Sequence, residues 1–279
     1  MEKDTKDLKY KIIFSDLDYT LLVNNEIPDF NLEAIQKARK AGVKFVICTG
    51  RDLDITYHLL KQLNIDNLEN EYTICCSGAK IYENKTKKPI HINYLPNEIV
   101  KELFDFGKQF TEIVVLFDTS NGIYVYNSKI LAKEAEKVKM VYTDIKTLEE
   151  IKDFKVIRVV YGGESGEYIN KIQDEIKKSK IFDNRVDFYL TQNQFLEFNA
   201  SGVNKGEALK WLCNYLNINL NETIAIGDSY NDVSMLKVAG IGACVKSAED
   251  EIKKISKYVC EKDYFEGSVK EVIEKFILN

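Results

Sequence analysis

The stretch from Tyr10 to Leu22, YKIIFSDLDYTLL, decides the fold. Its first part, Tyr10–Ser15, is an apolar run with the length and composition of a strand that is buried on both faces. The run ends at Asp16, and Asp18 follows two residues later. Buried strands of this kind are typical of parallel sheets that helices cover on both sides. The stretch therefore predicts an α/β protein with a carboxylate at the end of an inner strand.

The same alternation of strand and helix extends outward from this stretch. Asn31 is expected to cap a helix that runs to Lys40, and Gly42 stands where a C-terminal glycine belongs. The other expected elements are strands Val43–Cys48, Tyr72–Cys76, Gln194–Phe198, Thr223–Ile226 and Ile241–Val245, and helices Leu53–Leu63, Lys205–Leu216, Asn231–Val238, Ala248–Ser256 and Ser268–Ile277. Right-handed strand–helix–strand units built from these elements predict a Rossmann-like parallel sheet.

The middle of the chain follows a different pattern. The strand-like runs here are only half apolar and rich in tyrosine and phenylalanine, which fits a sheet with one exposed face. The expected elements are helices Asn97–Gln109, Lys129–Lys137 and Gly166–Lys178, and strands Ile113–Phe117, Ile123–Tyr126, Val156–Tyr161 and Val186–Leu190. We therefore expect a catalytic core formed by residues 1–81 and 191–279, and a smaller inserted α+β domain at residues 82–190.

Composition narrows the class of protein. The 279 residues carry a net charge of −5 with both signs interspersed, which argues against a nucleic-acid partner. No run approaches the ~20 apolar residues of a membrane helix, and Met1–Lys9 lacks the apolar core of a signal peptide. The six cysteines form no CxxC pair, which indicates reduced thiols. With only two histidines, the chain offers few of the ligands that a zinc site needs. We expect a cytoplasmic protein without a membrane partner, as a monomer or a weak homodimer.

Polar side chains gather where the predicted strands end. Asp16 and Asp18 follow one strand, Thr49 follows the next, and Asp228 and Asp232 follow a third. In an open parallel sheet, ligands bind in the crevice beyond the carboxyl ends of the strands. Clustered carboxylates repel one another unless a cation joins them, and oxygen ligands suit Mg²⁺. The sequence therefore predicts a magnesium site that accepts a phosphate.

At this point the sequence resembles a known family, the haloacid dehalogenase (HAD) superfamily of phosphotransferases. Asp16–Leu22 looks like its first motif and Thr49–Arg51 its second, while Lys205 is similar to the lysine of its third. Gly227–Asp232, GDSYND, resembles its fourth. Each motif alone could be an ordinary turn or helix cap, and their joint order at strand ends carries the resemblance. The layout is most similar to the Cof-type sugar-phosphatase branch.

The chemistry of a phosphate monoester suggests roles for the first two aspartates. Asp16 would attack phosphorus and form an acyl phosphate, which splits one hard step into two. Asp18 would lie on the same face of an extended strand, protonate the leaving alkoxide and later deprotonate the attacking water. By resemblance, the carboxylates of Asp16 and Asp228 and the backbone carbonyl of Asp18 hold Mg²⁺. Asp232 would orient a metal-bound water.

The resemblance also implies the phosphate contacts. Thr49 and the N–H of Gly50 would bind a phosphoryl oxygen, and Lys205 would offset its negative charge. Asn231 is placed to contact the substrate or its phosphate. For Arg51, contact with the substrate and a structural ion pair both remain open.

Two positions depart from the family pattern. Tyr19 stands where the family usually has glycine, which puts the shape of the entrance in doubt. Ser77 stands where the branch commonly carries asparagine before glycine, so a substrate or loop contact differs.

The insert between Thr49 and Lys205 is the place of an α+β (C2-type) cap, which the resemblance links to substrate choice. The expected enzyme is a Mg²⁺-dependent phosphatase for small phosphate monoesters, such as sugar phosphates. Two alternatives stay open: a phosphotransferase or phosphomutase of the same superfamily, and a non-catalytic phospho-accepting binding module. The sequence does not name the substrate.

Overall fold

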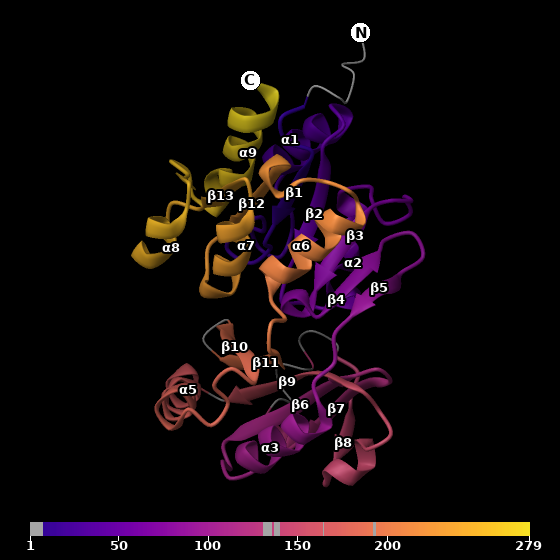
Figure 1. Ribbon diagram of the computed structural model, residues 1–279, viewed down its shortest axis with the longest axis vertical. Coiled ribbons are helices and arrows are strands. Elements are labelled where there is room, and N and C mark those ends of the chain that lie inside the picture. The colour runs from indigo at the N-terminus through magenta and orange to yellow at the C-terminus, as the bar shows by residue number, and fades with distance from the viewer. Residues whose placement is uncertain (1–7, 131–135, 137–139, 164, 192–193) are drawn as a thin grey trace. The chain divides into compact units, whose positions relative to one another are not determined.

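The computed structural model describes residues 8–130, 136, 140–163, 165–191 and 194–279. The chain forms two compact units (Figure 1): unit 1 comprises Met1–His91 and Asn204–Asn279, and unit 2 comprises Ile92–Val203. The boundaries expected from sequence, at 81/82 and 190/191, lie earlier in the chain than these. The strand at residues 80–83 spans the first expected boundary and the strand at 88–92 follows it, and both belong to the sheet of unit 1. The strand at residues 195–200 follows the second expected boundary and belongs to the sheet of unit 2.

Unit 1 is built on an eight-stranded sheet with the order β14-β13-β12-β1-β2-β3-β4-β5. Its strands are β1 Ile12–Ser15, β2 Lys44–Cys48, β3 Tyr72–Cys75, β4 Lys80–Glu83, β5 Lys88–Ile92, β12 Thr223–Gly227, β13 Ile241–Cys244 and β14 Tyr258–Val259. From β14 to β3 every pairing is parallel, and β3 pairs with β4 in the antiparallel sense. The prediction of an α/β fold is confirmed.

The central position of β1 explains its composition. Every residue of β1 is buried, because the strand has β12 on one side and β2 on the other and both of its faces are covered. Ser15 is aligned with Ile226 of β12 and with Ile47 of β2, so the three strands end together. The side chains that follow them therefore start from one edge of the sheet.

The helices of unit 1 are α1 Asp29–Lys40, α2 Leu53–Gln62, α6 Lys205–Tyr215, α7 Val233–Val238, α8 Asp250–Ile255 and α9 Ser268–Ile273. Apolar residues of α6, α7 and α8 pack with Ile12 and Phe14 of β1 in one buried cluster. The start of α2 is fixed by Asp52, whose side chain accepts a hydrogen bond from the N–H of Leu53 at 2.7 Å.

The expected cap of α1 is wrong. The helix begins two residues before Asn31, with Pro28 in the cap position. Asn31 is completely buried inside the helix. Its amide donates to the carbonyl of Leu21 at 3.3 Å, and its oxygen accepts from the N–H of Lys270 at 3.1 Å. Tertiary partners therefore override its preference for a cap, while Gly42 takes the expected left-handed conformation with φ 97°.

Unit 2 has a six-stranded sheet with the order β10-β11-β9-β6-β7-β8. Its strands are β6 Ile113–Thr119, β7 Gly122–Tyr126, β8 Thr143–Ile145, β9 Val156–Gly163, β10 Val186–Thr191 and β11 Phe195–Ala200, and its helices are α3 Asn97–Gly107 and α5 Gly166–Ser179. The pairs β10–β11, β11–β9, β9–β6 and β6–β7 are antiparallel. Of the helix expected at 129–137, the residues 131–135 and 137 lie outside the described residues.

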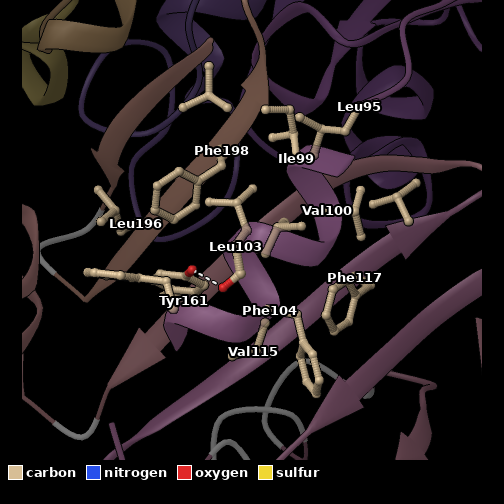
Figure 2. Close-up of a cluster of buried hydrophobic side chains, with 14 of the residues drawn as sticks. Leu95, Ile99, Val100, Leu103, Phe104, Val115, Phe117, Tyr161, Leu196 and Phe198 are labelled. Atoms are coloured by element: carbon tan, nitrogen blue, oxygen red, sulfur yellow. Dashed lines mark hydrogen bonds between the residues drawn. The ribbon is translucent and has the colours of Figure 1, made fainter. Parts of the chain in front are cut away.

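Unit 2 has a hydrophobic core of its own. Figure 2 shows Phe104 of α3 beside Phe117 of β6, and Leu103 of α3 beside Tyr161. The buried hydroxyl of Tyr161 donates to the backbone carbonyl of Leu103, which satisfies a polar group inside the core. Within the described part of the chain, no helix has the length and apolar character needed to cross a membrane.

Candidate functional site

Asp16, the expected nucleophile, lies directly past β1 at the carboxyl end of the central strands of unit 1. Its N–H donates to the carbonyl of Ile226 in β12 at 3.0 Å, which continues the parallel ladder by one residue. Its side chain is nearly buried, with 6% of the residue exposed. The neighbouring strand β12 leads to Asp228 and Asp232, and β2 leads to Thr49. Three adjacent strands thus bring these side chains to one edge.

Lys205 provides a buried positive charge beside Asp16. It is the first residue of α6 and is completely buried. Its Nζ donates to a carboxylate oxygen of Asp16 and to Oδ1 of Asp232 at 2.6 Å. Burial alone would lower the pKa of Lys205, but the two carboxylates outweigh burial and raise it, so the ammonium stays charged. A buried charge needs such partners, because an isolated one is costly.

Asp232 is held by the backbone that follows β12. Its Oδ2 accepts from the N–H of Asp228 at 3.0 Å and from the N–H of Ser229 at 3.1 Å. Its Oδ1 accepts from Lys205. A carboxylate has about four acceptor positions, so three donors leave little capacity for another partner. Asp232 therefore supports Lys205 and fixes the turn that carries Asp228.

Asp228 completes an acidic cluster. Its Oδ1 accepts from the hydroxyl of Thr20 at 2.7 Å. Carboxylate oxygens of Asp16, Asp228 and Asp232 all lie within 4.8 Å of one another. Burial raises the pKa of Asp16 to about 7; Lys205 opposes this rise, whereas Asp232 and Asp18 add to it. Burial also raises the pKa of Asp228 well above its usual range, and Asp16 and Asp232 add to the effect. The cluster thus holds more negative charge than one lysine offsets.

These donors fit Mg²⁺. They are all hard oxygen atoms that lie within 4.8 Å of one another. Burial raises the pKa values of Asp16 and Asp228 and the neighbouring carboxylates add to it, so a cation placed among them would stabilise their charged forms. Within the described residues the cluster includes no histidine or cysteine, the ligands that zinc prefers.

Asp18 differs from the extended-strand expectation. β1 ends at Ser15, and Asp18 already belongs to a turn in which the N–H of Thr20 donates to the carbonyl of Leu17. The carboxylate of Asp18 forms a two-pronged ion pair with Arg51: Nη2 lies 2.5 Å from Oδ1 and Nε lies 2.9 Å from Oδ2. Of the two roles left open for Arg51, the structure contains the ion pair.

Thr49 and the turn after β3 form the other side of this edge. The Thr49 hydroxyl oxygen accepts from the N–H of Arg51 at 3.1 Å, which leaves its hydrogen to donate elsewhere. In the adjacent turn, Cys76 and Ser77 both have φ 53°, and Gly78 has φ 102°. The left-handed conformation costs an L-residue about 1–2 kcal/mol, so this buried turn stores strain. From the sequence, Ser77 stood out only because it replaces the asparagine that the family pattern led us to expect before glycine.

Asn231 carries an unused polar atom. Its side-chain oxygen is buried and has no hydrogen-bond partner among the described residues. Buried polar atoms nearly always have a partner, so this oxygen retains the capacity to accept a hydrogen bond. Thr20 was given no role in the sequence-based expectations, although it lies in the same motif as Asp16. Its hydroxyl is what ties that motif to Asp228.

The fold and the buried acidic cluster together define an α/β protein with a carboxylate site at the ends of its central parallel strands. Residues 13–273 match the family model of haloacid dehalogenase-like hydrolases. The chain therefore belongs to the haloacid dehalogenase-like hydrolase family, and the prediction of a Cof-type hydrolase is confirmed.

The chain is similar to relatives along its whole length. Phosphoglycolate phosphatase from Methanobrevibacter smithii is 30% identical, with 94% of this chain and 97% of that protein covered. 5-Amino-6-(5-phospho-D-ribitylamino)uracil phosphatase from Bacillus subtilis is 26% identical, with 98% of each covered. The crystal structure of a haloacid dehalogenase-like hydrolase from Bacteroides thetaiotaomicron aligns with a TM-score of 0.80 at 27% identity, covering 96% of this chain and 99% of that one.

Proposed function

We propose that the protein is a Mg²⁺-dependent phosphatase that hydrolyses small phosphate monoesters through a phospho-aspartate on Asp16. One observation carries this proposal. The buried carboxylate of Asp16 is paired with the buried ammonium of Lys205, and its oxygens lie close to those of Asp228 and Asp232. This arrangement offers a nucleophile, a fixed cation and a space for a second cation at the edge of the sheet where α/β proteins bind ligands.

The metal would be held by a small set of oxygen atoms. These are the carboxylates of Asp16 and Asp228 and the backbone carbonyl of Asp18. When bound, Mg²⁺ would neutralise negative charge on the transferring phosphoryl group. Asp232 would remain close by as the residue that positions Lys205 and Asp228.

The chain's own residues would carry out two displacements at phosphorus. In the first, an oxygen of Asp16 forms a bond to phosphorus while the bond to the leaving alkoxide breaks, and Asp18 gives that alkoxide a proton. In the second, Asp18 takes a proton from a water molecule, whose oxygen bonds to phosphorus as the bond to Asp16 breaks. Inorganic phosphate leaves, and both aspartates return to their starting states.

The phosphoryl oxygens would be bound by donors from neighbouring loops. The hydroxyl of Thr49 has its hydrogen available, because its oxygen already accepts from Arg51. The N–H of Gly50 and the ammonium of Lys205 would add two donors, and such preorganised donors stabilise charge that develops in the transition state. The buried oxygen of Asn231 supports its proposed contact with the substrate, since an acceptor suits a substrate hydroxyl.

A panel of phosphorylated metabolites, assayed for phosphate release with Mg²⁺, tests the proposal. Two of the relatives are named as phosphatases of phosphoglycolate and of a ribitylaminouracil phosphate, so both compounds belong in the panel. Sugar phosphates, nucleotides, flavin mononucleotide and pyridoxal phosphate complete it. Phosphate release without an added acceptor identifies a hydrolase. Transfer only to a sugar would identify a phosphotransferase, and binding without turnover would identify a phospho-accepting module.

Two variants separate the proposed roles of the aspartates. Asp16→Asn should abolish turnover and covalent labelling, because an amide does not attack phosphorus. Asp18→Asn should slow turnover by roughly 10²–10⁴-fold and leave Mg²⁺ binding largely intact, since only its backbone carbonyl would touch the metal. Normal activity of purified Asp16→Asn protein would refute the mechanism.

Unit 2 is proposed to select the substrate, as a C2-type cap. Apart from Asn231, the residues above would contact only the phosphoryl group, which every candidate substrate shares, so the leaving group must be distinguished mainly elsewhere. All six cysteines are buried and stand outside disulfides, which supports a reducing compartment, and we place the enzyme in the cytoplasm. Its partner would be a small phosphorylated metabolite, bound by a monomer or a weak homodimer.

A further inference from the structure

The turn after β3 contains three consecutive residues with positive φ: Cys76, Ser77 and Gly78. The first two carry side chains, and both are essentially buried. L-residues rarely adopt this conformation, and such strain persists only where the surrounding structure enforces it. The turn also lies at the carboxyl end of a strand next to β2, although neither Cys76 nor Ser77 has a role in the proposed mechanism.

The backbone of this turn holds the loop that follows β2. The N–H of Cys76 donates to the carbonyl of Arg51, and the N–H of Ser77 donates to the carbonyl of Thr49, each at 3.0 Å. Both acceptors belong to the Thr49–Arg51 loop, which is proposed to bind the phosphoryl group. The left-handed path of the turn thus directs two successive N–H groups at that loop.

The other side of the turn touches the start of α6. A Cβ built on Gly78 would lie 2.4 Å from the carbonyl oxygen of Asn204 and 3.1 Å from the backbone nitrogen of Lys205. Asn204 is the cap of α6, and its side chain accepts from the N–H of Glu207 at 3.0 Å. Because Gly78 has no side chain, the backbone at the start of α6 can pack directly against it, and Lys205 occupies the first position of this helix.

We propose that Cys76–Gly78 is a positioning element that sets the spacing between the Thr49–Arg51 loop and Lys205, although it does not touch the phosphate itself. This inference rests on the proposed phosphate site. The strained backbone acts as a stiff spacer: hydrogen bonds fix one side to the loop, and close packing fixes the other side to the helix. A misplacement of either group by a fraction of an ångström would weaken both binding of phosphate and turnover.

The first test compares two glycines. Gly78→Ala places a methyl group against the Asn204 carbonyl, whereas Gly122→Ala places one at φ 124° with no atom within 4 Å. Both variants carry the strain of alanine at positive φ, and only the first displaces α6. We expect Gly78→Ala to lose about tenfold or more in kcat and in affinity for inorganic phosphate, measured by calorimetry with Mg²⁺. Gly122→Ala should match the wild type in both measurements.

The second test separates an effect on positioning from an effect on stability, and it can be carried out even if Gly78→Ala does not fold. Ser77→Gly and Ser77→Ala lose the same hydroxyl, but only glycine relaxes the left-handed backbone. Ser77→Gly should therefore melt at a higher temperature than Ser77→Ala. It should nevertheless bind inorganic phosphate and turn over roughly threefold to tenfold less well than Ser77→Ala, because the spacer has become flexible. A purely structural turn would instead make activity follow stability.

The outcomes distinguish this proposal from the proposed function. If the wild type releases no phosphate from any substrate, the phosphatase proposal fails. The amide ¹H–¹⁵N signals of Gly50 and Lys205 still test the positioning role of the Cys76–Gly78 turn, because they should shift in Gly78→Ala and not in Gly122→Ala. If the wild type is active, the positioning role is overturned by either of two results. One is a folded Gly78→Ala with unchanged kcat, phosphate affinity and amide signals. The other is Ser77→Gly activity equal to that of Ser77→Ala.

Discussion

At the scale of single residues, the ion pair between Asp18 and Arg51 governs how the proposed acid/base would work. The guanidinium contacts both oxygens of the Asp18 carboxylate and also donates to Oδ1 of Asn25 at 2.6 Å. A two-pronged contact of this kind fixes the direction in which the carboxyl group points. Arg51 would thus act through Asp18 by orienting it, without touching the reacting atoms.

Replacing Arg51 tests this role through the leaving group. In Arg51→Met, we expect kcat for a sugar phosphate to fall by roughly 10- to 100-fold, because a poor alkoxide leaving group needs a well-placed acid. The loss for p-nitrophenyl phosphate should be much smaller, since nitrophenolate leaves without a proton. Arg39→Met removes the ion pair with Glu71 and serves as the control. An equal loss on both substrates with a raised KM would instead indicate direct contact with the substrate.

Tyr19 shows how one residue departs from a family pattern. Its φ is 58°, a left-handed conformation that favours glycine, the residue that the family resemblance led us to expect there. The conformation costs about 1–2 kcal/mol for a residue with a side chain. The Tyr19 ring packs edge-on against Tyr264, with centroids 5.6 Å apart, and a contact of this kind contributes about 0.5–1.5 kcal/mol. The aromatic contact therefore offsets part of the strain.

At the scale of elements, the strand ends were the most predictable part of the site. Continuous apolar runs at residues 12–15, 44–48 and 223–227 indicated buried parallel strands, and the polar residues after them do meet at one edge. Strands β4 and β5 were not predicted, because their sequences are half polar and β5 contains Pro89. The turn at Asp18 was also missed, since nothing local in an Asp-Leu-Asp sequence shows where an extended strand stops.

The proposed metal site depends on the register of β1 and β12, so metal exchange tests both the acidic cluster and the pairing of these strands. Chelation should remove activity, and Mg²⁺ should restore it. Ca²⁺ should bind yet support little turnover, because its longer and more variable coordination would misplace the phosphoryl group. Mn²⁺ should substitute at least in part, since it prefers the same oxygen ligands. Full activity after exhaustive chelation would contradict a metal-dependent reaction.

Asn31 links α1 to α9 and gives a prediction about stability. Asn31→Ala removes two buried hydrogen bonds and leaves the carbonyl of Leu21 and the N–H of Lys270 without this partner. Each buried group left unsatisfied costs about 1–3 kcal/mol. We expect the free energy of unfolding to fall by about 2–4 kcal/mol in urea titrations, with kcat unchanged at low temperature. Gln36→Ala, on the exposed face of α1, should have little effect. An equal effect of both variants would show that the buried amide contributes nothing specific.

At the scale of the whole molecule, the inserted position of unit 2 was visible in the sequence, but its ends were not. The chain leaves unit 1 after His91 and returns at Asn204. Sheet membership sets these ends, and it depends on pairing between distant segments. β11 pairs with β10, the strand directly before it in the sequence, and also with β9, which lies further back in the chain. A pattern along one segment does not reveal which sheet it joins.

Removing unit 2 tests its proposed part in substrate choice. A variant in which a short linker replaces residues 92–203, provided that it unfolds cooperatively, should lose far more activity toward a phosphorylated metabolite than toward p-nitrophenyl phosphate. The reason is that the phosphoryl contacts in unit 1 are common to both substrates. Steady-state kinetics with the two substrates measures the ratio. Equal losses in a demonstrably folded variant would show that unit 2 supports the structure and does not select substrates.

The parallel pairing of β1 with β12 also has a consequence for biosynthesis. At roughly 5–20 residues per second, a ribosome needs about 10–40 s to make the roughly 200 residues between Ser15 and Thr223. During this interval β1 pairs with β2 on one edge only, and its other edge is an apolar template for pairing with another chain. Unit 2 is completed within the same interval and buries its own core. The nascent chain therefore passes through a stage at which unit 2 is folded while β1, the strand before Asp16, is not yet paired with β12. Aggregation during synthesis would begin at this unpaired edge of β1.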